Sequence, residues 1–142
     1  MVFFINNCTS RDEKSKKEKV VPNTITMLYV TQPECPSCTK LEEVMTQDEP
    51  KKIIESFFTI KKIYLGEKIP AGLPEPNGTP TVYFLGSNDE ALVEPIIGEK
   101  NETELMEYLN DALYEFKNIY GMELSEVQKA ENNETNLSKA HV

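Results

Sequence analysis

A short apolar segment that leads directly into a pair of cysteines is the feature of this sequence that most restricts its fold. Residues Thr24–Val30, with the sequence TITMLYV, are rich in β-branched and apolar side chains, which indicates a buried strand. Pro33 ends this strand, and a helix is expected to begin near Cys35. Pro36 suits the first turn of that helix, because the N–H it lacks would have no helical partner there. The sequence therefore predicts a strand followed by a helix that opens on a C-x-x-C motif.

The rest of the chain predicts three more strands and two more helices. In order, these are a helix opened by Pro50, a strand at Thr59–Leu65, a loop rich in glycine and proline, a strand at Thr81–Gly86, a strand at 91–97 in which Pro95 indicates an edge position, and an amphipathic helix that follows Asn101. The first two strands are joined through helices and should be parallel, whereas a short turn makes the last two an antiparallel hairpin. We expect an α/β fold with a central mixed four-stranded sheet and helices on both of its faces.

Length and charge are those of one soluble domain with short extensions. The chain has 142 residues and a net charge of −9, which argues against nucleic acid as a partner, and it has no apolar run of membrane-spanning length. We expect a flexible leader at residues 1–22, a folded domain at 23–120, and a helical extension with a disordered tail at 121–142. The leader carries Cys8 between an apolar stub and a charged run. Cys8 is either an incidental cysteine in a disordered leader or the lipid anchor of an envelope protein whose signal begins upstream.

The two thiols of the motif differ in their expected environment. Cys35 should lie at the start of the helix, where unpaired backbone N–H groups and the helix dipole favour a thiolate. Cys38 lies one turn further along and should be more shielded, so one sulfur can attack a disulfide and the other can resolve the product. Two readings compete with this one. A structural zinc site needs four ligands, and no second ligand pair is apparent within one chain, while a structural disulfide closing so short a loop would add little stability.

A second motif follows about forty residues later, where Thr79 and Pro80 open the segment TPTVYFLG. A C-x-x-C that opens a helix after a buried strand, a Thr-Pro that opens a hairpin, and a C-terminal helix together resemble the thioredoxin superfamily over about residues 23–118. The stretch TMLYVTQPECPSCTKLEEVM is most similar to bacterial periplasmic thiol–disulfide interchange proteins. The resemblance implies that Cys35 attacks, that Cys38 resolves, and that Pro80 is a cis-proline facing both. It also implies that Thr79 offers backbone groups to an extended substrate strand.

The chain departs from the thioredoxin pattern at the motif itself. Thioredoxins carry Trp-Cys-Gly-Pro-Cys, whereas here Glu34 replaces the tryptophan and Pro36-Ser37 replaces Gly-Pro. Glu34 is either a solvated charge or a group that opposes the thiolate of Cys35, and these three residues are candidates for tuning the redox pair. Thioredoxins also carry a buried acid on the first strand, which helps to move protons for the resolving cysteine. The matching position here is Tyr29.

These observations lead to one expected function and two rivals. We expect a monomeric thiol–disulfide oxidoreductase that acts on protein thiols and disulfides together with a redox partner protein, through Cys35 and Cys38 alone and without a cofactor or metal. The first rival is a thioredoxin-fold binding or redox-sensing module without turnover, and the second is metal binding by two C-x-x-C pairs across a dimer. The resemblance and the position of Cys8 favour the bacterial cell envelope over the cytoplasm.

Overall fold

The computed structural model describes residues 21–131. Its elements are β1 (Ile25–Thr31), α2 (Pro36–Met45), α3 (Asp48–Phe57), β2 (Phe58–Tyr64), β3 (Thr81–Leu85), β4 (Ile96–Ile97) and α4 (Glu102–Tyr120), followed by a helical stretch at 124–131. Each element of the sequence prediction is present at least in part, although α3 begins two residues before the expected Pro50.

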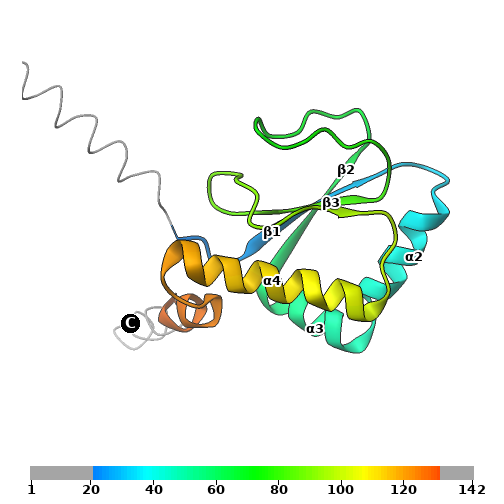
Figure 1. The fold of residues 1–142 in the computed structure, drawn as a ribbon. Helices are drawn as coiled ribbons and strands as arrows, with labels where there is room; N and C mark the ends of the chain where they lie inside the picture. The colour runs from blue at the N-terminus through cyan, green and yellow to red at the C-terminus, as the bar shows by residue number, and fades with distance from the viewer. Residues whose placement is uncertain (1–20, 132–142) are drawn as a thin grey trace, which may run out of the picture.

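The strands form one mixed sheet in the order β2-β1-β3-β4. β1 is parallel to β2 and antiparallel to β3, and β3 is antiparallel to β4, as the sequence predicts for strands joined by helices and by a turn. Helices α2 and α3 connect the parallel strands β1 and β2 along the chain, and Figure 1 shows them on the same side of the sheet as α4. Parallel strands with a helical crossover, then a hairpin and a C-terminal helix, make up the thioredoxin fold.

The helices α2, α3 and α4 all pack on one face of the sheet. This face of the core joins Ile25, Met27 and Tyr29 of β1 to Leu41 of α2 and Leu109 of α4, and Ile54 of α3 belongs to the same cluster. The expectation of helices on both faces is therefore wrong for residues 21–131. The opposite face, formed by Leu28, Val30, Ile63, Tyr83 and Leu85, is covered by Ile69 and Leu73 of the loop between β2 and β3.

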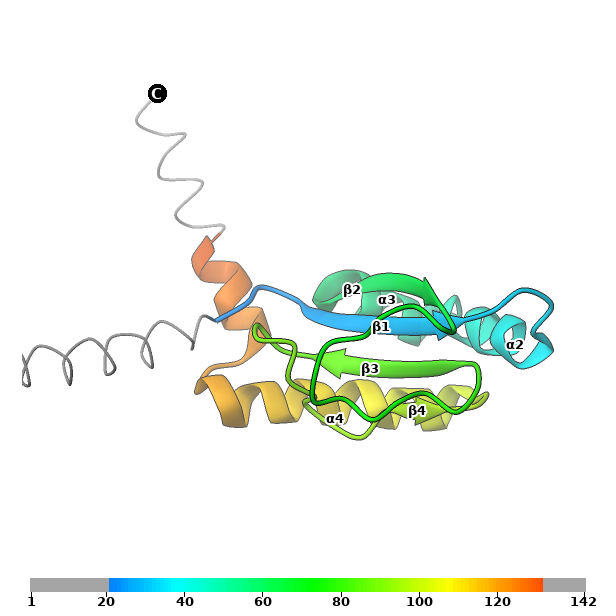
Figure 2. The ribbon, with the colours of Figure 1, turned by 90° about the horizontal axis from the view of Figure 1, so that it is seen from above.

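The loop between β2 and β3 forms no helix because it is rich in proline and glycine. Residues 66–80 read GEKIPAGLPEPNGTP, and the repeated prolines and glycines break any helical run. The Tyr83 hydroxyl donates a hydrogen bond to the Pro74 carbonyl and fixes the loop on the sheet. Figures 1 and 2 show this loop passing over the sheet on the side away from α4 before it returns to β3.

The predicted strand at 91–97 forms only in part. Regular pairing with β3 is limited to Ile96 and Ile97, and Leu85 and Ala91 form an isolated bridge. Val82 pairs with Ile96, and the Leu92 N–H donates to the Phe84 carbonyl. Between these two contacts, the three residues 93–95 lie opposite the single residue Tyr83 of β3. Pro95 lies among these three, and because it has no N–H to donate, the ladder is interrupted there.

The end of the domain is tied to its beginning. Asn101 caps α4 with a full capping box, and Gly121 ends the helix at a left-handed φ of 78° that suits glycine. Leu124 and Val127 of the stretch 124–131 belong to the core. The Gln128 side chain donates to the backbone carbonyls of Asn23 and Ser56, at 2.9 and 2.8 Å. Figure 2 shows this stretch beside the start of β1.

The expected leader with Cys8 lies mostly outside the described residues, as does the tail after Glu131. Among the helices of residues 21–131, none is long and apolar enough to cross a membrane.

Candidate functional site

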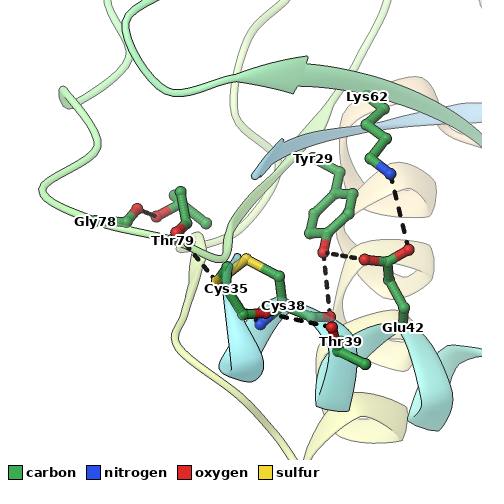
Figure 3. The surroundings of a disulfide bond; sticks show 9 residues. Tyr29, Cys35, Cys38, Thr39, Glu42, Lys62, Gly78 and Thr79 are labelled. Carbon is green, nitrogen blue, oxygen red and sulfur yellow. Dashed lines mark hydrogen bonds and ion pairs between the residues drawn. A yellow bond between two sulfur atoms is a disulfide. The ribbon is translucent and has the colours of Figure 1, made fainter. Parts of the chain in front are cut away.

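Cys35 and Cys38 form a disulfide at the start of α2 (Figure 3). Cys35 is the N-cap of the helix, with an extended backbone, and its sulfur accepts a hydrogen bond from the Cys38 backbone N–H at 3.1 Å. Pro36 follows in the first turn, as the sequence predicts. The cap role usually taken by a serine or aspartate oxygen is thus taken here by a cysteine sulfur. A sulfur at this position lies at the positive end of the helix dipole.

The two sulfurs differ in their access to solvent. Cys35 is partly exposed, whereas Cys38 is 2% exposed and belongs to the helical face of the core. Cys35 therefore lies at the surface of the domain, whereas Cys38 is enclosed by the core. The pair can store and release two electrons by opening and closing its disulfide.

The segment before β3 brings Thr79 against the cysteine pair. The hydroxyl of Thr79 lies 3.3 Å from the Cys35 sulfur, and the Thr79–Pro80 peptide bond is cis, as predicted. The segment is held in place by the Thr81 hydroxyl, which donates to the Gly78 carbonyl at 2.9 Å. The Gly98 N–H donates to the Pro80 carbonyl at 2.9 Å and ties the segment to the end of β4. Residues 44 positions apart thus meet at one surface.

The other predicted residues surround Cys35 in different ways. Glu34 is exposed and adopts a left-handed φ of 55°, a conformation that costs a residue with a side chain more than it costs glycine. Ser37 is partly buried and Pro36 is exposed. No contact joins Glu34 or Ser37 to either sulfur among the hydrogen bonds and ion pairs of the described residues.

A polar chain that the sequence interpretation missed lies behind the disulfide. The Tyr29 hydroxyl has two acceptors within hydrogen-bond distance, the Cys38 carbonyl at 3.3 Å and Glu42 Oε2 at 3.1 Å, and Glu42 Oε1 lies 3.8 Å from Lys62 Nζ. Figure 3 shows Glu42 in contact with both the Tyr29 hydroxyl and the Lys62 amine beside α2. Two signals point to this chain. Glu42 stands four residues after Cys38 on a helix, and Lys62 is the register partner of Tyr29 on the neighbouring parallel strand.

Burial has a large effect on the Tyr29 side chain. Burial, together with the hydrogen bond and negative charge of Glu42, raises the pKa of Tyr29 from 10.0 to about 12, although a hydrogen bond with Thr31 acts in the opposite direction. Tyr29 is therefore neutral at physiological pH and acts as a hydrogen-bond donor rather than as a base.

A metal centre is not formed within residues 21–131. No group of three or more His, Cys, Asp or Glu side chains in this part of the chain is arranged to hold a metal ion.

Comparison with known proteins finds similarity in solved structures. No family model matches the chain, and no curated protein does. A thioredoxin from Thermus thermophilus is 22% identical, with a TM-score of 0.48 over 61% of this chain and 72% of its own. The oxidised C-terminal domain of Neisseria meningitidis DsbD is 20% identical, with a TM-score of 0.48 over 76% of this chain and 95% of its own. The periplasmic thioredoxin SoxS from Paracoccus pantotrophus is 18% identical, with a TM-score of 0.44 over 62% of this chain and 98% of its own.

Because these scores lie below 0.5, the thioredoxin fold is assigned from the molecule itself. The strand order, the cysteine pair at the start of α2 and the Thr79–Pro80 segment beside it carry that assignment.

The raised pKa of Tyr29 predicts how stability depends on pH. Between pH 10 and 12 the unfolded chain loses the Tyr29 proton before the folded chain does, so the free energy of unfolding falls as pH rises. Tyr29→Phe should lose about 1 kcal/mol less stability than the original chain between pH 8 and pH 11, as measured by urea unfolding. Tyr114→Phe, at a side chain that is 65% exposed, is the matched control. Equal losses in the original chain and in Tyr29→Phe would contradict the prediction.

Proposed function

We propose that this chain is a thiol–disulfide oxidoreductase that exchanges disulfides with protein substrates through Cys35 and Cys38. The observation that carries the proposal is the position of the Cys35 sulfur. Cys35 is a partly exposed residue, and its sulfur accepts a hydrogen bond from the Cys38 N–H at the start of α2 and lies beside the Thr79 hydroxyl. A thiolate at this position is stabilised by the helix N-terminus, and only the thiolate is a competent nucleophile.

The reaction follows from the order of the two sulfurs. In the reduced protein, the Cys35 thiolate attacks one sulfur of a substrate disulfide, and the other substrate sulfur leaves as a thiolate. Cys38 then gives up its proton and attacks Cys35, so that the Cys35–Cys38 bond forms as the bond to the substrate breaks. The substrate disulfide is reduced by two electrons and the cysteine pair is oxidised. The reverse sequence oxidises a substrate dithiol, and a redox partner protein restores the starting state in either case.

The segment around Pro80 is proposed as the substrate platform. The Thr79 hydroxyl lies 3.3 Å from the Cys35 sulfur, and the backbone N–H and carbonyl of Thr79 are proposed to pair with an extended substrate strand. Main-chain pairing of this kind would align a substrate cysteine with Cys35 without requiring a particular side-chain sequence.

The bacterial cell envelope is the proposed location. The proposal is supported by the resemblance of residues 26–45 to periplasmic disulfide exchangers and by the position of Cys8 between an apolar stub and a charged run. In intact bacteria carrying the full-length gene, a membrane-impermeant alkylating reagent should label the reduced protein if it lies outside the inner membrane. Labelling that appears only after cell lysis would place the protein in the cytoplasm.

The roles of the two cysteines predict different trapping behaviour. With insulin as a model protein disulfide, Cys38→Ser should form a mixed disulfide that it cannot resolve, whereas Cys35→Ser should form almost none. The adducts are measured by mass spectrometry under non-reducing conditions, with Cys8→Ser in both proteins to remove adducts of the leader thiol. Equal trapping by the two variants would overturn the assignment of roles. Trapping by neither would favour a binding or redox-sensing module.

Glu34, Pro36 and Ser37 are proposed to tune the redox pair, and Glu34 makes the sharpest prediction. Its negative charge immediately before Cys35 should oppose the Cys35 thiolate. Glu34→Gln should therefore form the thiolate at lower pH, as followed by thiolate absorbance of the reduced protein. Coincident titration curves for the two proteins would show that Glu34 is only a solvated charge.

A further inference from the structure

The polar chain behind the disulfide runs from the Cys38 carbonyl through Tyr29 of β1 to Glu42 on the same helix as Cys38 and to Lys62 of β2. The Tyr29 hydroxyl has one hydrogen and two acceptors within reach, the Cys38 carbonyl at 3.3 Å and Glu42 Oε2 at 3.1 Å. An ionised carboxylate is the stronger acceptor, so Glu42 is held towards Tyr29 and the first turns of α2. Lys62 holds the other carboxylate oxygen at 3.8 Å from its Nζ.

Cys38 is the thiol on which such a charge would act. Glu42 stands four residues after Cys38, and side chains at this spacing lie on the same face of a helix, about 5–6 Å apart at their Cβ atoms. Cys38 is 2% exposed, so its thiolate is already disfavoured by burial and few solvent molecules screen a nearby charge. The exposed Glu43 on the same helix is not among the partners of Tyr29.

We propose that Glu42 and Tyr29 are positioning residues for the resolving thiol. Tyr29 holds the Glu42 carboxylate towards the first turns of α2, and Glu42 keeps a negative charge one turn after Cys38, so that Cys38 stays a thiol while Cys35 attacks. Lys62 offsets part of that charge. The consequence is a longer-lived mixed disulfide, because Cys38 must lose its proton before it can displace the substrate.

This inference rests on the proposed exchange reaction and concerns only its second step. In that step the proton of Cys38 is taken up by the departing substrate thiolate, the Cys35–Cys38 bond forms, and the bond from Cys35 to the substrate breaks. No further oxidant or reductant is needed, because the electrons pass from the cysteine pair to the substrate sulfur.

Other charged groups surround α2 and define the necessary controls. Glu34 precedes the motif, and α3 contributes Lys51 and Glu55, which line the same open cavity of about 310 Å³ as Glu42. On the opposite side of α2, the groups beside Lys40 and Glu43 are Glu99, Lys100 and Glu104. Among the described residues, Tyr29 is the side chain that hydrogen-bonds both to Cys38 and to a charged group.

The proposal is tested on a full-length protein in which Cys35→Ser and Cys8→Ser leave Cys38 as the single thiol. Thiolate absorbance is titrated, with the alkylated protein as the blank. Glu42→Gln, which keeps a hydrogen-bond acceptor for Tyr29, should form the Cys38 thiolate about half a pH unit lower, because the half-exposed carboxylate is partly screened. Lys62→Met should move the titration in the opposite direction. Glu43→Gln removes the same charge from the same helix and should leave the curve unchanged.

Opposite shifts are the decisive result, because a loosening of the fold would move Glu42→Gln and Lys62→Met in the same direction. Equal shifts in Glu42→Gln and Glu43→Gln, or no shift in Glu42→Gln, would overturn the proposal. In the protein with both motif cysteines, Glu42→Gln should also resolve a mixed disulfide with insulin about twofold faster below the pH at which Cys38 titrates, because the larger thiolate fraction is partly offset by the lower nucleophilicity of a more acidic thiol. The titration is made in a protein that cannot turn over. A failure of exchange itself would therefore overturn the proposed function without touching this result.

Discussion

The hydrogen bond from the Cys38 N–H to the Cys35 sulfur is the interaction on which the site depends. It forms because β1 ends at Thr31 and α2 begins at Pro36, which leaves Cys35 as the N-cap. The helix N-terminus offers donors that have no helical partner, and a sulfur occupies the position where a capping oxygen usually lies. The same geometry stabilises a thiolate and places the second sulfur under the first turn. The arrangement that caps the helix is therefore the same one that the proposed function uses to activate Cys35.

The surrounding fold packs around the cysteine pair from both faces of the sheet. The core on the helical face buries Cys38, while the loop from 66 to 80 crosses the other face and delivers Thr79 to within 3.3 Å of Cys35. The loop is anchored by Ile69, Leu73 and the Tyr83 hydroxyl rather than by a helix. Substrate contacts are therefore expected from a loop that is fixed to the sheet at several points.

Much of this arrangement could be predicted from local sequence patterns. The apolar run of β1, the first-turn Pro36 and the amphipathic face of α4 specify their elements directly, because each pattern is set within a few residues. The faces on which helices pack are not local. Helices on both faces were expected, whereas the loop covers the second face with two side chains, Ile69 and Leu73. The strand at 91–97 was overestimated, because a proline signals an edge without showing where pairing stops. The link from Tyr29 through Glu42 to Lys62 depends on the register between β1 and β2, which only the folded chain supplies.

Catalytic turnover tests the central claim most directly. The Cys8→Ser protein is incubated with a large excess of insulin and dithiothreitol, and the number of insulin disulfides reduced per molecule of protein is measured above the rate with dithiothreitol alone. The account predicts many disulfides per molecule, with the excess rate lost in Cys35→Ser. At most one equivalent, or an excess rate that survives in Cys35→Ser, would contradict it and leave a thioredoxin-fold protein that binds or senses without catalysing exchange.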